Sequence, residues 1–277
     1  MFYVGKFDES KFAVPHPHAQ NSQGYERAVL MDRSIGSVHM GVGICQLQPM
    51  GHVRSRIHAN EKGIYILEGE LEIKRGHEAF RLSADDYALI PYGMAHALRN
   101  RGDRTARWFE MQAPQPKPPG GWQDTFFADD NDWPAQVGPP DWENPDTRFS
   151  GRFGTQKPML PQGEGISGLA VYRFMEREFG AQHFFMMRGE LSVGGLRSRH
   201  DHPVEEFYFA LSGATFMDIE GERFHLRRGD IAWTGVGTSH AFCHTGDVPF
   251  RWIETQAPQF PARNGTRNYS DWDKLRA

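Results

Sequence analysis

The sequence contains only two cysteines in 277 residues, and its formal net charge is −4. Cys45 and Cys243 lie in strand-like segments of different halves, so we expect free thiols and no disulfide framework. Acidic and basic residues are interspersed, which leaves no basic patch for a nucleic acid or for an anionic membrane surface. This composition predicts a small-molecule substrate or ligand as the partner.

Long apolar runs are also missing, and the first residues carry acid early without the apolar core of a signal peptide. From this we predict a soluble protein with a cytoplasmic location and no membrane association. A glycine-rich fingerprint for nucleotides, in which a strand leads into a helix, is absent. Ser192, Ser198 and Ser239 have no triad partner that spacing identifies, so nucleophilic acyl chemistry has no support.

From residue 45 onward the chain consists of short segments rich in β-branched and aromatic residues, separated by Gly, Asp and Asn. Such segments predict an all-β barrel or sandwich, and helical periodicity is scarce. Shifting the chain against itself by 144 residues aligns His58 with His202, His96 with His240, and segment 107–115 with 251–259 without a gap. This repeat predicts a tandem duplication, with one barrel over 1–120, an irregular connection over 121–165 and a second barrel over 166–277.

The second repeat contains four side chains of the types that bind metals. His200 and His202 are two residues apart, so both imidazoles leave the same face of an extended strand, and Glu206 returns to that face four residues later. His240 follows a glycine-rich turn and can close the same site. Three imidazoles and one carboxylate suit a first-row divalent ion, and octahedral coordination would leave positions for water or substrate.

The spacing of these residues resembles the two motifs of the cupin superfamily. It reads Gly-x5-His-x-His-x3-Glu-x6-Gly and then Gly-x5-Gly-x-Gly-x2-His-x3-His, with Gly235 and His244 where the family usually has Pro and Asn. The resemblance implies two tandem cupin barrels, each a jelly-roll or double-stranded β-helix, and a metal site in the second. It implies Mn(II) or Fe(II) as the cofactor, with Ni, Zn and Cu left open, bound by four ligands: His200, His202, Glu206 and His240.

The first repeat departs from this ligand set at two of the four positions. Arg56 replaces the first histidine and Lys62 replaces the glutamate, and two fixed cations would repel a metal ion. We therefore expect a degenerate site without metal. Two alternatives stay open, either an anion or carboxylate held by both cations or a barrel filled by packed and paired side chains. Strand alternation places Glu61 on the opposite face, and we interpret His16 and His18 as loop residues.

Residues that differ between the repeats near the metal are candidates for substrate contact or proton transfer. His244 and Tyr208 replace Asn100 and Ile64 of the first repeat, and both keep the metal-facing parity of their strands, so we predict them as catalytic. A buried, hydrogen-bonded His244 and a Tyr208 that belongs to the core are the alternatives. Arg197 precedes the ligands and is predicted to bind a substrate carboxylate.

A segment shared by both repeats is interpreted as scaffold. It reads Arg-Trp-x-Glu-x-Gln-Ala-Pro-Gln, so we predict that Trp252, Glu254 and Gln256 serve the fold and not the chemistry. Uncovered barrel edges would invite association, which predicts a homodimer.

Three functions fit these features. Cupins with a similar ligand set include oxygenases, decarboxylases, isomerases and inactive storage proteins. The leading hypothesis is a mononuclear Fe or Mn dioxygenase acting on a small oxygenated molecule, aromatic or enol. The second is an oxygen-independent metal-dependent lyase, decarboxylase or hydrolase for a carboxylate or ureido substrate. The third is a noncatalytic cupin that binds a small molecule.

Overall fold

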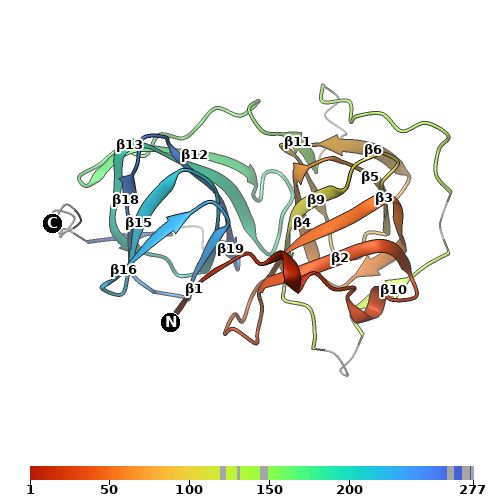
Figure 1. Cartoon of the computed structure of the whole chain (residues 1–277), viewed down its shortest axis with the longest axis horizontal. Coiled ribbons are helices and arrows are strands. Elements are labelled where there is room, and N and C mark those ends of the chain that lie inside the picture. The colour runs from red at the N-terminus through yellow and green to blue at the C-terminus, as the bar shows by residue number, and fades with distance from the viewer. Residues whose placement is uncertain (119–122, 130–131, 144–148, 261–264, 270–274, 276–277) are drawn as a thin grey trace. The chain divides into compact units, whose positions relative to one another are not determined.

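The computed structural model describes the chain except for residues 119–122, 130–131, 144–148, 261–264, 270–274 and 276–277. The described residues form two ten-stranded sheets, each of which curls into a barrel, and two short 3-10 helices, Glu9–Lys11 and His16–His18 (Figure 1). This confirms the all-β prediction and the two tandem barrels. Within the described residues, no helix is long and apolar enough to cross a membrane.

The N-terminal sheet has the strand order β11-β7-β4-β9-β3-β8-β5-β6, and β2 and β10 both pair with β3. Its strands are β2 (Ser22–Met31), β3 (Gly41–His58), β4 (Glu61–Glu68), β5 (Glu70–Arg75), β6 (Glu78–Ser83), β7 (Asp86–Ile90), β8 (His96–Arg99), β9 (Ala106–Ala113), β10 (Thr125–Phe127) and β11 (Ser150–Arg152). All pairings are antiparallel, which allows one face of each strand to point into the barrel.

The C-terminal sheet has the strand order β1-β17-β14-β19-β13-β18-β15-β16, and β12 and β20 both pair with β13. Its strands are β1 (Phe2–Lys6), β12 (Ile166–Met175), β13 (Phe185–Asp201), β14 (Glu205–Ser212), β15 (Ala214–Ile219), β16 (Glu222–Arg227), β17 (Asp230–Thr234), β18 (His240–Thr245), β19 (Phe250–Ala257) and β20 (Arg267–Asn268). The order repeats that of the N-terminal sheet with each core strand shifted by 144 residues, so the repeat seen in the sequence is a repeat of strand pairing.

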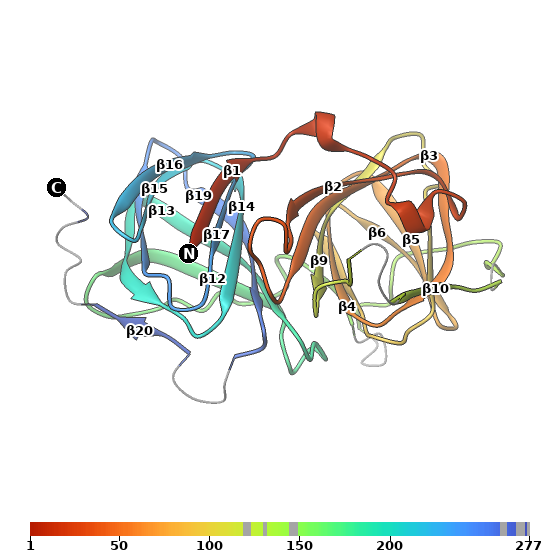
Figure 2. The same ribbon diagram turned by 90° about the horizontal axis from the view of Figure 1, so that it is seen from below.

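Each sheet has one edge covered by a strand from outside the repeated unit. β1 pairs with β17 (Figure 2). β11 pairs with β7, the equivalent strand of the other sheet. The sequence assigned all of 1–120 to the N-terminal barrel, but strand pairing places Phe2–Lys6 in the C-terminal sheet. The edge strand supplies unpaired backbone groups that β1 satisfies, and no compositional signal marks such a long-range pairing.

Each barrel has its own apolar core, in which equivalent tryptophans take part. Trp108 is fully buried in the N-terminal core, and Trp252 stacks on Phe242 in the C-terminal core with ring centroids 5.6 Å apart. His18 was predicted as a loop residue, but its side chain is buried and its ring lies 5.1 Å from that of Tyr25. His16 is exposed. His18, in the second 3-10 helix, therefore packs against the N-terminal core.

Candidate metal centre

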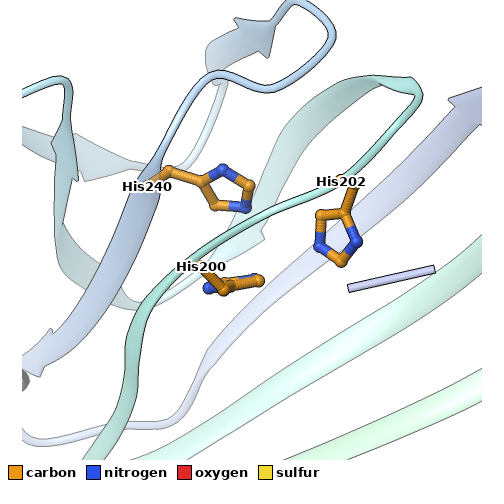
Figure 3. A group of neighbouring side chains, drawn as sticks. All are labelled: His200, His202 and His240. Atoms are coloured by element: carbon orange, nitrogen blue, oxygen red, sulfur yellow. The ribbon is translucent and has the colours of Figure 1, made fainter. Parts of the chain in front are cut away.

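Strands β13, β14 and β18 bring the predicted metal ligands together in the C-terminal barrel. His200 lies in β13 and His202 directly after it, Glu206 lies in β14, and His240 opens β18, where its Cα is paired with that of His200. One ring nitrogen from each histidine lies within 4.8 Å of the other two. Figure 3 shows the three imidazole rings gathered in one place.

Hydrogen bonds fix the tautomer of all three histidines. The Nδ1 atoms of His200 and His240 lie 2.8 and 3.0 Å from the carbonyl oxygens two residues earlier, and that of His202 lies 2.6 Å from the carbonyl of Gly265. A carbonyl oxygen only accepts, so each Nδ1 carries the proton and donates it. Each Nε2 therefore keeps a lone pair free to bind a metal, the arrangement typical of metal-binding histidines.

The carboxylate of Glu206 faces two of these lone pairs. Its Oε1 lies 3.2 Å from Nε2 of His202, and its Oε2 lies 3.2 Å from Nε2 of His240. All of these atoms are acceptors, and their close approach is unfavourable unless a proton or a cation lies between them. The residues present thus fit a divalent cation, and Gln256 orients the carboxylate by donating from Nε2 to Oε1 at 2.7 Å.

Burial shapes the electrostatics of the ligands. It lowers the pKa of His240 to about 3 and also lowers the pKa values of His200 and His202, which keeps the imidazoles neutral near pH 7. Burial also raises the pKa of Glu206 to about 8 in the metal-free protein. A cation bound by the neutral imidazoles would favour the ionised form of this carboxylate, so metal binding and deprotonation of Glu206 are coupled.

A pocket of about 210 Å³ opens beside the ligands, and His200 and His202 line it. Its walls are mostly apolar and aromatic, and they include Leu169, Phe242 and Trp252. Its polar lining consists of the two histidines together with Arg173, Arg197, Tyr208, Glu254, Gln256 and Thr266. The pocket suits a small, largely apolar molecule with a few polar groups at the metal end.

The structure brings Tyr208, predicted as catalytic, and Arg197, predicted to bind substrate, to this site. The hydroxyl of Tyr208 donates to Oε2 of Glu206 at 3.0 Å and lies 3.0 Å from Nε2 of His240. Arg197 lines the same pocket, while Arg199 stacks over the ring of Tyr269, 4.0 Å from its centroid. Tyr208 thus lies on the metal-facing side of its strand, as its parity predicts.

His244 does not reach the site, which corrects its prediction as a catalytic residue. Its Nε2 donates to the carbonyl of Val248 at 2.8 Å, and its Nδ1 accepts from the backbone N–H of Gly194 at 3.3 Å. Asn100 makes the equivalent bond to the carbonyl of Arg104 in the N-terminal barrel. Strand parity fixes the face but not the position along the strand, and four residues span about 13 Å, so His244 points inward far from His240.

Glu254 is the functional candidate that sequence reasoning missed. It lines the pocket, is buried, and accepts from Nε1 of Trp252 at 2.9 Å. Burial, followed by the charge of Glu206, raises its pKa to about 8. The repeat concealed it because Glu110 occupies the same position in the first barrel. Its parity with Gln256, on the strand beside Glu206, was the signal that could have revealed it.

Comparison with known proteins identifies the domains. Residues 43–111 and 187–255 each match the cupin domain family. The chain is 34% identical over 101 residues to the polyketide synthase protein CurC of Streptomyces cyaneus, which covers 36% of this chain and 66% of that protein. It is 32% identical over 115 residues to the tetracenomycin polyketide synthase protein TcmJ of Streptomyces glaucescens, covering 41% of this chain and 76% of that protein.

Solved structures show the same architecture at low sequence identity. An oxalate decarboxylase variant from Bacillus subtilis superposes with a TM-score of 0.69 at 15% identity, covering 97% of this chain and 80% of that one. A salicylate 1,2-dioxygenase variant from Pseudoaminobacter salicylatoxidans, solved with gentisate, gives 0.64 at 16% identity, covering 80% and 69%. These likenesses concern the fold, and with the two domain matches they lead to one conclusion: the chain belongs to the cupin family and is a bicupin.

Proposed function

We propose that this bicupin is a metal-dependent dioxygenase that acts on a small oxygenated organic molecule, aromatic or enol. The observation that carries the proposal is the convergence of the Glu206 carboxylate on the free lone pairs of His202 and His240, a donor set that fits a cation beside an apolar pocket. Mn(II) or Fe(II) suits three imidazoles and one carboxylate, and when bound such an ion supplies redox chemistry with dioxygen.

The chain's own residues would bind and orient the substrate. Phe242 and Trp252, stacked in the pocket wall, favour an aromatic or apolar body and exclude water from it. Arg197 offers a guanidinium to an anionic oxygen of the substrate. Tyr208 donates to Glu206 and can hold or pass a proton beside the metal position. The names of both curated relatives, polyketide synthase proteins, support an oxygenated aromatic or enol substrate.

A second function, an oxygen-independent lyase or decarboxylase, is favoured by Glu254. A buried carboxyl group that lines the pocket, with no Lys or Arg paired to it among the described residues, can deliver a proton to the carbanion that remains when a substrate carboxylate leaves as carbon dioxide. The likeness to oxalate decarboxylase concerns the fold and leaves this option open.

Oxygen uptake separates these functions. Chains loaded with Fe(II), Mn(II) or Zn(II) would be incubated with catechols, hydroxybenzoates and 1,3-diketones in an oxygen electrode and, in parallel, without oxygen. A dioxygenase consumes oxygen only with Fe(II) or Mn(II), because Zn(II) lacks redox chemistry. Turnover that is equal without oxygen and with Zn(II) would replace the dioxygenase by the lyase. Saturable binding of a probe without turnover under any condition would favour the noncatalytic binding protein.

The predicted homodimer and cytoplasmic location remain predictions. Sedimentation equilibrium at micromolar concentration tests the first, and a strictly monomeric mass would contradict it.

A further inference from the structure

The interior of the N-terminal barrel holds more positive charge than its carboxylate can balance. Lys62 Nζ lies 3.4 Å and Arg27 Nε 3.6 Å from the same oxygen of Glu110, and all three side chains are buried or nearly so. Arg56 is 1% exposed and forms no ion pair with any residue that the structure describes; it donates one long bond, at 3.4 Å, to the carbonyl of Arg54. Three cations thus share one anion.

Several polar atoms in this interior also lack a hydrogen-bond partner. In the described part of the chain, the buried atoms without a hydrogen-bond partner include Nε and Nη2 of Arg27, Nε of Arg56, Nε2 of His58, Nε2 of His96 and both ring nitrogens of His18. Nδ1 of His96 donates to the carbonyl of Met94 at 3.0 Å, so its Nε2 is an acceptor. Leaving a buried donor unpaired costs about 1–3 kcal/mol, and more for a charged group. A guanidinium without an acceptor is the most costly of these, so Arg56 favours the binding of a group that accepts.

The side chains of Arg56, His58 and His96 lie close to one another in this interior. Arg56 and His96 are Cα partners across β3 and β8, and the rings of His58 and His96 lie 5.0 Å apart. Desolvation is the main cause that lowers the pKa values of His58, His96 and His18. The next cause is the charge of Lys62 at His58 and the charge of Arg56 at His96 and His18. The carboxylate of Glu61 accepts from the backbone N–H of Gln182 at 3.0 Å.

We propose that the N-terminal barrel binds a small carboxylate anion between Arg56 and Lys62, at the position that corresponds to the metal in the C-terminal barrel. A guanidinium pairs with both oxygens of a carboxylate, and the ammonium of Lys62 supplies a further donor. Three cations less the Glu110 carboxylate leave two uncompensated charges. A carboxylate costs less to desolvate than a phosphate dianion, which favours the former in an interior lined by Tyr25 and Ile64.

Calorimetric titration of the metal-free full chain tests this site. Sodium acetate and sodium malonate would be added after chelation and dialysis into a buffer of low anion content, with sodium phosphate and sodium chloride at matched ionic strength as comparisons. We expect saturable binding of one carboxylate per chain and a higher midpoint of thermal unfolding with it. Binding of phosphate as strong as that of either carboxylate would overturn the ligand class, and no saturation by any anion would overturn the site.

Matched variants locate the binding. Arg56→Met should weaken carboxylate binding by about tenfold or more, since it removes a charge-assisted pair. Arg223→Met removes an arginine of the other barrel that pairs with Asp218 and does not line the pocket, and it should leave the affinity unchanged. Equal affinity in Arg56→Met and in the unaltered chain would overturn the proposal. If Arg56→Met does not fold, Lys62→Met gives the same comparison and the same deciding outcomes.

Discussion

The two barrels share one strand order and one register but differ in the ionisable side chains of their interiors. In the N-terminal barrel Arg27, Arg56 and Lys62 surround Glu110, whereas in the C-terminal barrel Glu206 and Glu254 face three neutral histidines and one arginine, Arg197. Positions 56 and 62 account for most of this difference, since they correspond to His200 and Glu206. The backbone therefore determines where a ligand would lie, and two side chains determine the sign of its charge.

The two repeats share a glutamate, Glu110 in the first and Glu254 in the second, whose pKa is shifted in opposite directions in the two barrels. Glu110 accepts from Lys62 and lies beside Arg27, so the pKa of Glu110 is lowered despite burial. Glu254, at the same position, has no ion-paired Lys or Arg among the residues that the structure describes, and burial raises its pKa to about 8. One residue type at one register position can thus be an ion-pair partner in one copy and a neutral acid in the other, because the neighbours decide its protonation state.

Removal of a metal ligand is expected to have the largest effect. His200→Ala or Glu206→Ala should reduce bound metal from about one ion per chain to almost none, while the sheet and core keep the barrel folded. The matched change in the other barrel, His58→Ala, should leave the metal content unaltered. Elemental analysis of reconstituted chains measures this, and metal lost from the His58→Ala chain would contradict the assignment of the site.

A graft tests whether two side chains suffice to invert the comparison. The double variant Arg56→His with Lys62→Glu gives the first barrel the ligand set of the second, beside His58 and His96 on the same backbone. We expect a second metal ion per chain, because cation repulsion is removed and the four ligands have equivalent register. A folded double variant that still binds a single ion would show that more than positions 56 and 62 separates the barrels.

Replacing the shared glutamate by glutamine should lower the free energy of unfolding much more in the N-terminal barrel than in the C-terminal barrel. Glu110→Gln leaves Lys62 buried without its carboxylate and is expected to cost about 3–5 kcal/mol of unfolding free energy. Glu254→Gln replaces a carboxyl that is mostly protonated at neutral pH, so it should cost less than about 1 kcal/mol in metal-free protein. Urea unfolding at pH 7 compares the two. Equal losses would contradict the different protonation states.

The pH dependence of stability should report the burial of Lys62. Burial is the main cause that lowers its pKa from 10.5 to about 8. Between these values the unfolded chain binds the proton and the folded chain does not, so stability rises with pH, by on the order of 3 kcal/mol. Cys45, whose pKa is raised to about 12, acts in the opposite direction above pH 9. Subtracting the profile of Lys62→Met isolates the lysine, and a difference that stays flat from pH 8 to 10.5 would contradict its lowered pKa.

The smallest effect is expected at His244. Asn100 makes the same bond to the carbonyl four residues later, so His244→Asn should preserve that bond and change metal content and turnover by less than about twofold. A hundredfold loss of turnover with the metal retained would restore His244 as a proton-transfer residue. At this position the two barrels make the same hydrogen bond to a backbone carbonyl with different residues.

The sequence by itself determined the duplicated all-β fold and the faces of the metal-binding side chains. Alternation along a strand has a period of two, so His200, His202 and Glu206 had to share a face wherever the strand lay. The cupin spacing added His240, and the exchange of His and Glu for Arg56 and Lys62 already marked the first barrel as different.

The tertiary structure alone decided which inward-facing groups meet. Parity placed His244 on the inner face, but its distance along the strand kept it from the metal, whereas the length of Tyr208 brought its hydroxyl to Glu206 and His240. Glu254 lines the pocket with a raised pKa because burial disfavours its charged form, and Phe2–Lys6 joined the C-terminal sheet because an edge strand there needed partners. Such outcomes depend on depth, neighbours and long-range backbone pairing, which the local pattern of a sequence does not encode.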